Sequence, residues 1–498
     1  MTSPAASGPA SSAAPAGPWE PPPRVAAEVP GPPGGALAAA RRLRADPLTR
    51  MTELRQEYGP VVRLASWPVS AFLVSDPDVA ADALVSGHRA YAKGAVVRGP
   101  GSRGTVTQPL TYLLGEGLLT SAGEAHRRQR RLIQPLFHRH RIAEYGEQFV
   151  AITDATAATW HDGERLDLHA RMTEMTLAIV AKTLFDVPLD DHVVEVVRAA
   201  VARNMPAARR ATWPGFARVE QLPLRGPRRR RDSRDALDRA VYEMIAARRT
   251  TGATGTDLLS LLLDAQDADT GERMTDTQIR DEAMTLLLAG HETTANALAW
   301  TFHLLGEAPE VAARLHAEVD TVLGGGLPAV EDLPRLTYTN AVFSESMRLY
   351  PPVWAMGRHL VEDREVAGYL LPAGSTLVFS QWVIHRDERW WPEPTRFDPT
   401  RWLEPKTGEH AGPDGQAGEA PTGCPHAPAR PRFAYFPFGG GTRQCMGNSF
   451  AITEGVLALA TIARRWAFTA ASDVPVVPEP LVTLRPQGGL PMLAHHRG

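Results

Sequence analysis

One cysteine near the C-terminus, placed by a run of glycines at the start of a helix, constrains this chain more than any other feature. Residues 436–447 read FPFGGGTRQCMG. The consecutive glycines 439–441 can adopt positive φ and let the backbone approach a flat ligand closely. Apolar spacing after Gly447 predicts a helix over 448–466, and a thiolate at its start feels the positive end of the helix dipole. Cys445 is therefore a candidate anionic metal ligand.

The cysteine content narrows the kind of metal site. The chain holds only Cys424 and Cys445, which excludes a disulfide framework, a four-cysteine zinc site and a standard iron–sulfur cluster. By itself, a cysteine in a glycine-rich turn is more often a buried structural residue than a ligand. A ligand role therefore needs support from a second signature.

A long apolar helix supplies the second pattern. Thr275 and Gln278 form a capping box that predicts its start, and the helix runs to about Leu305. At its centre lies a polar island with the sequence AGHETT, residues 289–294. An apolar helix with such an island is expected to be buried.

The polar island contains the residues that a small-molecule site would need. Gly290 in mid-helix costs roughly 1 kcal/mol relative to alanine, and Thr293 can bond back to the Ala289 carbonyl and distort the helix. The two effects together could open a groove for a small ligand and a water, with Glu292 beside it as a proton source. A harmless polar patch on a core helix explains the island equally well when it is considered alone.

Together, the two patterns resemble the signatures of the cytochrome P450 family. Residues 438–447 match Phe-x-x-Gly-x-Arg-x-Cys-x-Gly, and 289–294 match (Ala/Gly)-Gly-x-(Asp/Glu)-Thr-Thr. The resemblance covers about residues 36–498. It implies the P450 fold, which is mainly α with a small β region, built around haem b (iron protoporphyrin IX).

The resemblance also implies a role for each matching residue. The thiolate of Cys445 would bind the haem iron, and the acid–alcohol pair would deliver protons to dioxygen. The other residues would contact the haem or its propionates. The implied acid–alcohol pair is Glu292 and Thr293, and the implied cofactor-binding residues are His126, Arg130, Arg358, Arg443, Phe438, Gly441, Ala289 and Gly290.

The propionate partners and a structural brace rest on weaker patterns. Many relatives have tryptophan where this chain has His126, but both side chains can donate an N–H to a carboxylate. Glu345 and Arg348 resemble the family's Glu-x-x-Arg pair, which joins an arginine from a downstream loop. Arg396 and Arg401 are both candidates for that arginine, and we interpret the network as a brace for the haem side.

The organisation of the chain predicts one haem domain over 36–498, preceded by a disordered Pro/Ala-rich leader over 1–35. Residues 405–431, which include Cys424, are expected to form a surface insertion. The arginine run 225–234 reads as an exposed loop, either solvated or docking an acidic partner. No signal peptide or apolar membrane anchor is expected, and a formal net charge of −3 gives no reason to expect a nucleic-acid partner.

We therefore expect a cytoplasmic, monomeric monooxygenase that oxidises a hydrophobic small molecule with dioxygen. Electrons would come from an external ferredoxin and ferredoxin reductase, and the basic residues expected to receive the ferredoxin are Arg127, Arg128, Arg139 and Arg141. Segments 126–131 and 351–354 resemble actinobacterial terpene-oxidising members of the family. A peroxide-driven peroxygenase, a haem-thiolate sensor and a haem-free structural protein remain alternatives. The acid–alcohol pair argues against the peroxygenase.

Overall fold

The computed structural model covers most of the chain in detail. It describes residues 24–33, 43–65, 70–93, 110–186, 216–251, 257–266, 273–403 and 430–497, with short stretches at 41, 95–97, 105–107, 196, 199–200, 203–204 and 271. The expected insertion lies almost wholly outside the described residues, as does Cys424. Within the described part, no helix is both long and apolar enough to cross a bilayer.

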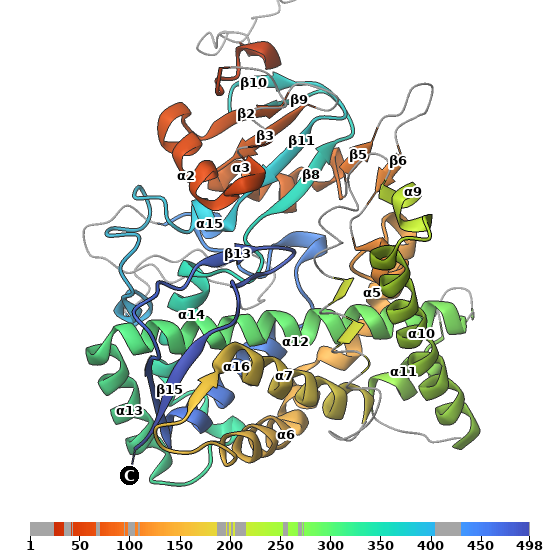
Figure 1. Ribbon diagram of the computed structural model, residues 1–498. Helices are drawn as coiled ribbons and strands as arrows, with labels where there is room; N and C mark the ends of the chain where they lie inside the picture. Colours follow the sequence, from red (N-terminus) through yellow and green to blue (C-terminus); the bar gives the residue numbers. More distant parts are fainter. Residues whose placement is uncertain are drawn as a thin grey trace, which may run out of the picture.

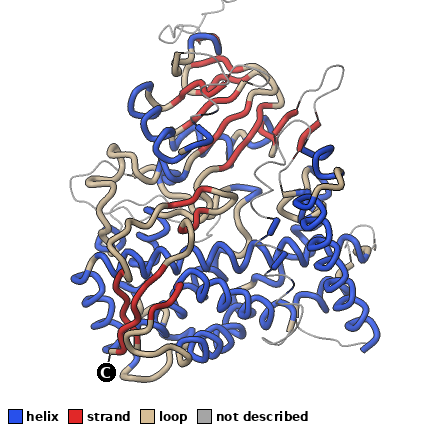
Figure 2. The backbone as a smooth tube through the Cα atoms, in the orientation of Figure 1, coloured by secondary structure: helices blue, strands red, loops and turns tan. Residues whose placement is uncertain are grey.

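A helical body carries a smaller β region at one end, and a second, small sheet lies against the helices near the C-terminus (Figures 1 and 2). The helices are α2 (Pro47–Tyr58), α3 (Pro77–Ala81), α4 (Thr111–Leu114), α5 (Gly123–Ile133), α6 (Arg139–Ala157), α7 (Leu168–Phe185), α9 (Phe216–Gln221), α10 (Arg225–Thr251), α11 (Leu258–Asp264), α12 (Asp276–Glu307), α13 (Pro309–Leu323), α14 (Thr337–Leu349), α15 (Gln381–Ile384) and α16 (Asn448–Ala463). This mainly helical architecture agrees with the fold class predicted from the sequence.

The strands form five small sheets. The largest has the order β2–β3–β11–β8–β4, and the others are β1–β10–β9, β12–β15–β7, β13–β14 and β5–β6. Their bounds are β1 (Arg24–Val25), β2 (Val61–Ala65), β3 (Ala71–Val74), β4 (Tyr91–Ala92), β5 (Ala95–Val97), β6 (Thr105–Thr107), β7 (Arg165–Asp167), β8 (Met356–Leu360), β9 (Arg364–Val366), β10 (Tyr369–Leu371), β11 (Thr376–Phe379), β12 (Trp466–Ala470), β13 (Pro478–Pro480), β14 (Leu484–Pro486) and β15 (Pro491–His496).

Helix α12 is the axis of the helical body, and α7, α14 and α16 pack against it (Figure 1). Its N-terminus has the predicted capping box, in which the Gln278 backbone N–H donates to the Thr275 hydroxyl and the Thr275 N–H donates to the Gln278 side chain. Buried residues occur on every face of the helix, as the sequence indicated.

Two predicted boundaries were wrong. Residues 24–33 of the expected disordered leader are ordered, because β1 pairs with β10 and Val29 is buried in the core under the sheet. The helix expected over 448–466 ends at Ala463, and Trp466 instead begins β12, which pairs with β15.

The arginine run was also predicted wrongly, because residues 225–234 form the first turns of α10 rather than a loop. Leu237, Val241 and Ile245 are buried at helical spacing and extend one apolar face along the segment. Arginine itself is a good helix former, so the run continues the helix toward its N-terminus.

Candidate active site

The loop that carries Cys445 is folded by contacts that require glycine. Gly441 has φ +64°, and a Cβ there would lie 1.8 Å from the carbonyl oxygen of Leu84. The loop then turns back on itself, because the Cys445 N–H donates to the carbonyl of Phe438 over 3.0 Å. Phe438 is partly buried against the main hydrophobic core. The predicted turn is therefore present, and it ends at the start of α16.

The sulfur of Cys445 is accessible yet enclosed by protein. The side chain is exposed to solvent, but burial is the largest influence on the thiol and raises its pKa. The backbone N–H of Gly447 and the positive charge of Arg130 act in the opposite direction and favour the thiolate. A thiol with these two influences beside it can be held as the thiolate that a metal ligand must be.

Five basic groups gather beside this loop from distant parts of the chain. They are Lys93, His126, Arg130, Arg358 and Arg443. Burial and mutual repulsion lower the pKa of Lys93 to about 7, of His126 to about 3, and of both Arg358 and Arg443 to about 10. Their pKa values fall because each proton is held in a desolvated, positively charged environment.

The side chains of this cluster donate to backbone carbonyls. Arg443 donates to Ser121 over 2.8 Å, Arg130 to Gln444 over 2.9 Å, and Lys93 to Leu119. Among the described residues no carboxylate forms a salt bridge with the five groups, and one terminal nitrogen of Arg443 is buried without a partner. Such a cluster is unfavourable unless an anion compensates it. The two propionates of haem have the charge and the oxygen acceptors that it lacks.

Sequence reasoning found four of these five groups and missed Lys93. Lys93 follows β4 in a segment without any recognisable motif. The one signal in the sequence was that lysine is rare in this arginine-rich chain, which contains only three lysines.

The polar island of α12 has the hydroxyl-to-carbonyl hydrogen bond that the sequence predicted for Thr293, and a second one beside it. The Thr293 hydroxyl donates to the Ala289 carbonyl over 2.8 Å, and the Thr294 hydroxyl donates to the Gly290 carbonyl over 3.2 Å. Ala289 is exposed although its neighbours toward the N-terminus of α12 are buried. A Cβ on Gly290 would come within 2.9 Å of Val180, so this position holds α7 close to α12.

Glu292 accepts a hydrogen bond from the β13–β14 hairpin, which the sequence analysis did not include in the site. The Thr483 hydroxyl donates to one Glu292 oxygen over 2.6 Å, while the other oxygen has no partner among the described residues. Burial raises the pKa of Glu292, and the Thr483 hydrogen bond and the charge of Arg485 oppose the rise. No periodicity or motif marks the β13–β14 hairpin in the sequence, since its contact depends on the tertiary fold alone.

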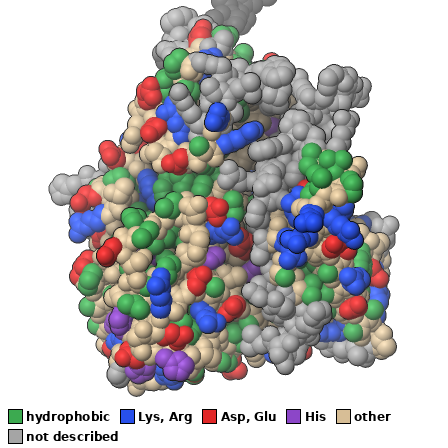
Figure 3. Space-filling view, viewed as in Figure 1, with side chains coloured by type: hydrophobic (Ala, Val, Ile, Leu, Met, Phe, Trp, Pro, Cys, Tyr) green, Lys and Arg blue, Asp and Glu red, His purple; other side chains and the backbone are tan. Residues whose placement is uncertain are grey.

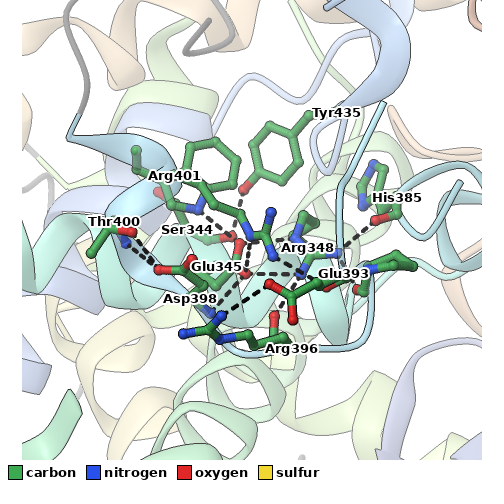
Figure 4. A network of polar contacts seen from close by, with 12 residues as sticks. Ser344, Glu345, Arg348, His385, Glu393, Arg396, Asp398, Thr400, Arg401 and Tyr435 are labelled. Carbon is green, nitrogen blue, oxygen red and sulfur yellow. Dashed lines mark hydrogen bonds and ion pairs between the residues drawn. The ribbon is translucent and has the colours of Figure 1, made fainter. Parts of the chain in front are cut away.

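The predicted brace is present, and the structure selects Arg401 as its third member (Figure 4). Glu345 and Arg348 are fully buried and share two hydrogen bonds of 2.8 Å. Arg401 approaches Glu345 at 3.3 Å, whereas the Arg396 side chain pairs with Glu393 and contributes only its carbonyl to Arg348.

The brace also reaches the cysteine loop. Arg348 donates to the carbonyl of His385 over 2.9 Å, and the ring Nε2 of His385 accepts the backbone N–H of Phe436 over 3.0 Å. Burial lowers the pKa of His385 well below its usual value, which keeps that nitrogen free to accept. The brace thus fixes the start of the loop that carries Cys445.

Comparisons with known proteins cover nearly the whole chain. A family model described as cytochrome P450 matches residues 29–491. The chain is 37% identical to cyclooctatin synthase of Streptomyces melanosporofaciens over 91% of each chain, and 35% identical to pentalenene oxygenase of Streptomyces avermitilis over 88% of this chain and 90% of the relative. The crystal structure of the cytochrome P450DA heme domain superposes with a TM-score of 0.79 at 26% identity, covering 95% of this chain and 99% of that one.

Proposed function

The chain belongs to the cytochrome P450 family and is a haem-dependent monooxygenase, and from this premise we propose that it oxidises a terpenoid of secondary metabolism. We further propose that it acts as a cytoplasmic monomer and receives electrons from a separate ferredoxin and its reductase. The presence of only two cysteines supports a reducing compartment.

The observation that carries the cofactor assignment is the buried cluster of basic groups beside the Cys445 loop, with which no carboxylate of the described residues forms a salt bridge. We assign Cys445 as the ligand to the iron of haem b, with Lys93, His126, Arg130, Arg358 and Arg443 around the propionates. Haem, when bound, supplies the iron at which dioxygen is reduced and one oxygen atom passes to the substrate. The protein's contributions are the thiolate, the orientation of the cofactor and the supply of protons.

Proton supply falls to the polar island of α12. The raised pKa of Glu292 favours its protonated form, from which it can donate a proton. The hydrogen bond from Thr483 fixes the orientation of this carboxyl group. The Thr293 hydroxyl donates its proton to the Ala289 carbonyl, so its oxygen can accept a hydrogen bond from water.

The substrate class rests on the relatives. These relatives are cyclooctatin synthase, a cyclooctat-9-en-7-ol 5-monooxygenase and pentalenene oxygenase. We therefore propose a cyclic, hydrocarbon-rich terpenoid, whose binding would be driven by burial of apolar surface. Ferredoxin would dock on the face formed by α5 and the start of α6. Two of the four predicted contact residues on that face also pair with acids, Arg127 with Glu124 and Arg141 with Glu144.

The decisive test compares the parent protein with Cys445→Ser. Reduced, carbon-monoxide-treated parent protein should show the red-shifted absorption band of a haem-thiolate, and the serine variant should lose it. Cyclic terpenes should then shift the haem spin state and be hydroxylated when ferredoxin, reductase and NAD(P)H are present. Product formation driven by hydrogen peroxide but not by ferredoxin would replace the proposal by the peroxygenase alternative. A haem-thiolate absorption band without formation of any oxidised product would favour the haem-thiolate sensor.

A further inference from the structure

The β13–β14 hairpin starts near the surface and ends in a buried tip. It lies beside α12 on the face that Figures 1 and 3 show, and the residues of β13 are half-buried. At its tip, Leu481 and Thr483 are only 9% and 5% exposed. The tip carries the hydroxyl that donates to Glu292 over 2.6 Å. Whatever fixes the tip therefore also fixes this hydrogen bond.

Two tryptophan side chains hold the tip on either side of Thr483. The indole N–H of Trp300, on α12, donates to the carbonyl of Leu484 over 3.0 Å. The indole N–H of Trp354 donates to the carbonyl of Leu481, also over 3.0 Å. A buried indole N–H usually finds an acceptor, so either bond alone would carry little meaning. Together they fix the backbone before and after one hydroxyl group.

The direction of the Trp300 indole is itself fixed by packing. The side chain is fully buried, and its ring stacks on the ring of Tyr350 with centroids 4.1 Å apart and planes 8° apart. The ring of His303 meets it edge to face at 5.5 Å. A ring packed in this way cannot follow a moving acceptor. The Leu484 carbonyl is therefore held at one place relative to α12.

The hairpin is thus attached to α12 at two points. Glu292 and Trp300 are eight residues apart on this helix, which separates their backbones by about 12 Å along the axis. One hydrogen bond would leave the tip free to pivot about it. Two bonds at this spacing set the position of Thr483 along the helix.

We propose that Trp300 and Trp354 are positioning residues for Glu292, which act by holding the Thr483 hydroxyl against its carboxyl group. This role rests on the proposed part of Glu292 in proton supply. The second carboxyl oxygen of Glu292 has no hydrogen-bond partner among the described residues, so the orientation of the group depends on Thr483. Loss of either anchor would let the carboxyl group turn, and both its proton affinity and its direction would change.

The other groups around Glu292 are retained in every variant of the test. From the hairpin, the charge of Arg485 opposes the rise in the pKa of Glu292, and Arg485 pairs with Glu479 over 2.9 Å. From α7, the ring of His169 lies 2.9 Å from Asn296, one turn after Glu292 on α12. Arg485 moves with the hairpin, so a small part of any change in pKa belongs to it.

The test is a double-mutant cycle on the full-length haem enzyme. Trp300→Phe and Trp354→Phe keep an aromatic ring and remove the N–H. The Thr483 hydrogen bond lowers the pKa of Glu292, so each change should move the alkaline limb of the kcat profile upward, as Thr483→Val does. Trp300→Phe should leave KM within about twofold of the parent value. In the Thr483→Val background both changes should lose most of their effect, because the hydroxyl through which they act is gone.

A spectroscopic measurement follows the carboxyl group without turnover. The infrared C=O band of protonated Glu292 is identified in the carbon-monoxide complex by its absence from Glu292→Gln. Loss of the hydroxyl donor should move this band to higher wavenumber in Thr483→Val. Trp300→Phe and Trp354→Phe should move it in the same direction.

Trp466→Phe is the matched control, because the Trp466 indole also donates to a backbone carbonyl, that of Ala157, over 3.1 Å. It should leave the pH profile and the infrared band as in the parent, and an unchanged carbon-monoxide absorption band verifies the haem site of each variant. The positioning role is excluded if Trp300→Phe and Trp354→Phe leave the infrared band in place, or if their pH shifts add in full to that of Thr483→Val. An unchanged kcat in Glu292→Gln would instead exclude the proton role, while the infrared band would still decide whether the tryptophans hold the carboxyl group.

Discussion

Two glycines of the Cys445 loop have similar backbone angles but different surroundings. Gly441 and Gly439 have φ of +64° and +70°. A Cβ on Gly441 would collide with the Leu84 carbonyl oxygen, whereas the nearest atom to one on Gly439 is Met356 Cε at 3.6 Å. We expect Gly439→Ala to lose about 1–2 kcal/mol of unfolding free energy through the left-handed backbone alone. Gly441→Ala should lose more than about 3 kcal/mol and bind haem poorly. Denaturant unfolding measures the loss of unfolding free energy, and haem titration measures the loss of haem binding. Equal losses in the two variants would show that the contact with Leu84 is unimportant.

The hydrogen bond from Thr483 to Glu292 makes a second prediction at the scale of single residues. That bond lowers the pKa of the carboxyl, so Thr483→Val should raise it. If Glu292 donates protons, its donating form then persists to higher pH, and the alkaline limb of the kcat profile should move upward. Glu292→Gln should reduce kcat about a hundredfold. Thr301→Val removes another buried hydroxyl of α12, which bonds only within its own helix, and should leave the pH profile unchanged.

At the scale of elements, Glu282 joins α12 to the segment that leads into α5. It is fully buried and accepts the backbone N–H of Leu118 over 2.9 Å. Burial, followed by the nearby charge of Asp281, raises the pKa of Glu282 from 4.5 to about 8. The native state therefore keeps a proton that the unfolded chain releases above about pH 4.5.

The stability contributed by this proton is present below pH 4.5 and is lost as pH rises through 8. Glu282→Gln keeps an oxygen that can accept from Leu118 but cannot ionise. It should flatten the decline of unfolding free energy between pH 5 and 8 by up to about 1.4 kcal/mol per pH unit. Denaturant unfolding at several pH values checks the slope, and a parallel decline in parent and variant would refute the assignment.

Local sequence signals predicted some elements well and others poorly. The box of Thr275 and Gln278 is a contact between neighbours in the chain, so its pattern alone predicted the start of α12. The arginine run misled because a run of charges was interpreted as a loop, while the apolar face that indicates a helix, Leu237, Val241 and Ile245, lies beyond the run. Thr483 could not be predicted at all, because its contact with Glu292 joins residues 191 positions apart.

At the scale of the whole molecule, ferredoxin docking is proposed on the face of α5 and the start of α6. Charge reversal at Arg127 and Arg139, on this face, should raise the KM for ferredoxin and make it less sensitive to salt. Reduction by dithionite should be unchanged. Reversal at Arg228 and Arg229 on α10 should leave the KM for ferredoxin unaltered, and steady-state kinetics at two ionic strengths will distinguish the two pairs of arginines. The opposite pattern would move the ferredoxin contact to α10.

The five basic groups and the cysteine loop also have a consequence for biosynthesis. Lys93 and His126 leave the ribosome more than 300 residues before Arg443 and Cys445. The site is therefore incomplete until the Cys445 loop has been made. Until then the early groups face one another without the loop that closes the site. Capture of haem should thus follow synthesis of this loop, and cells starved of haem should accumulate a less stable protein.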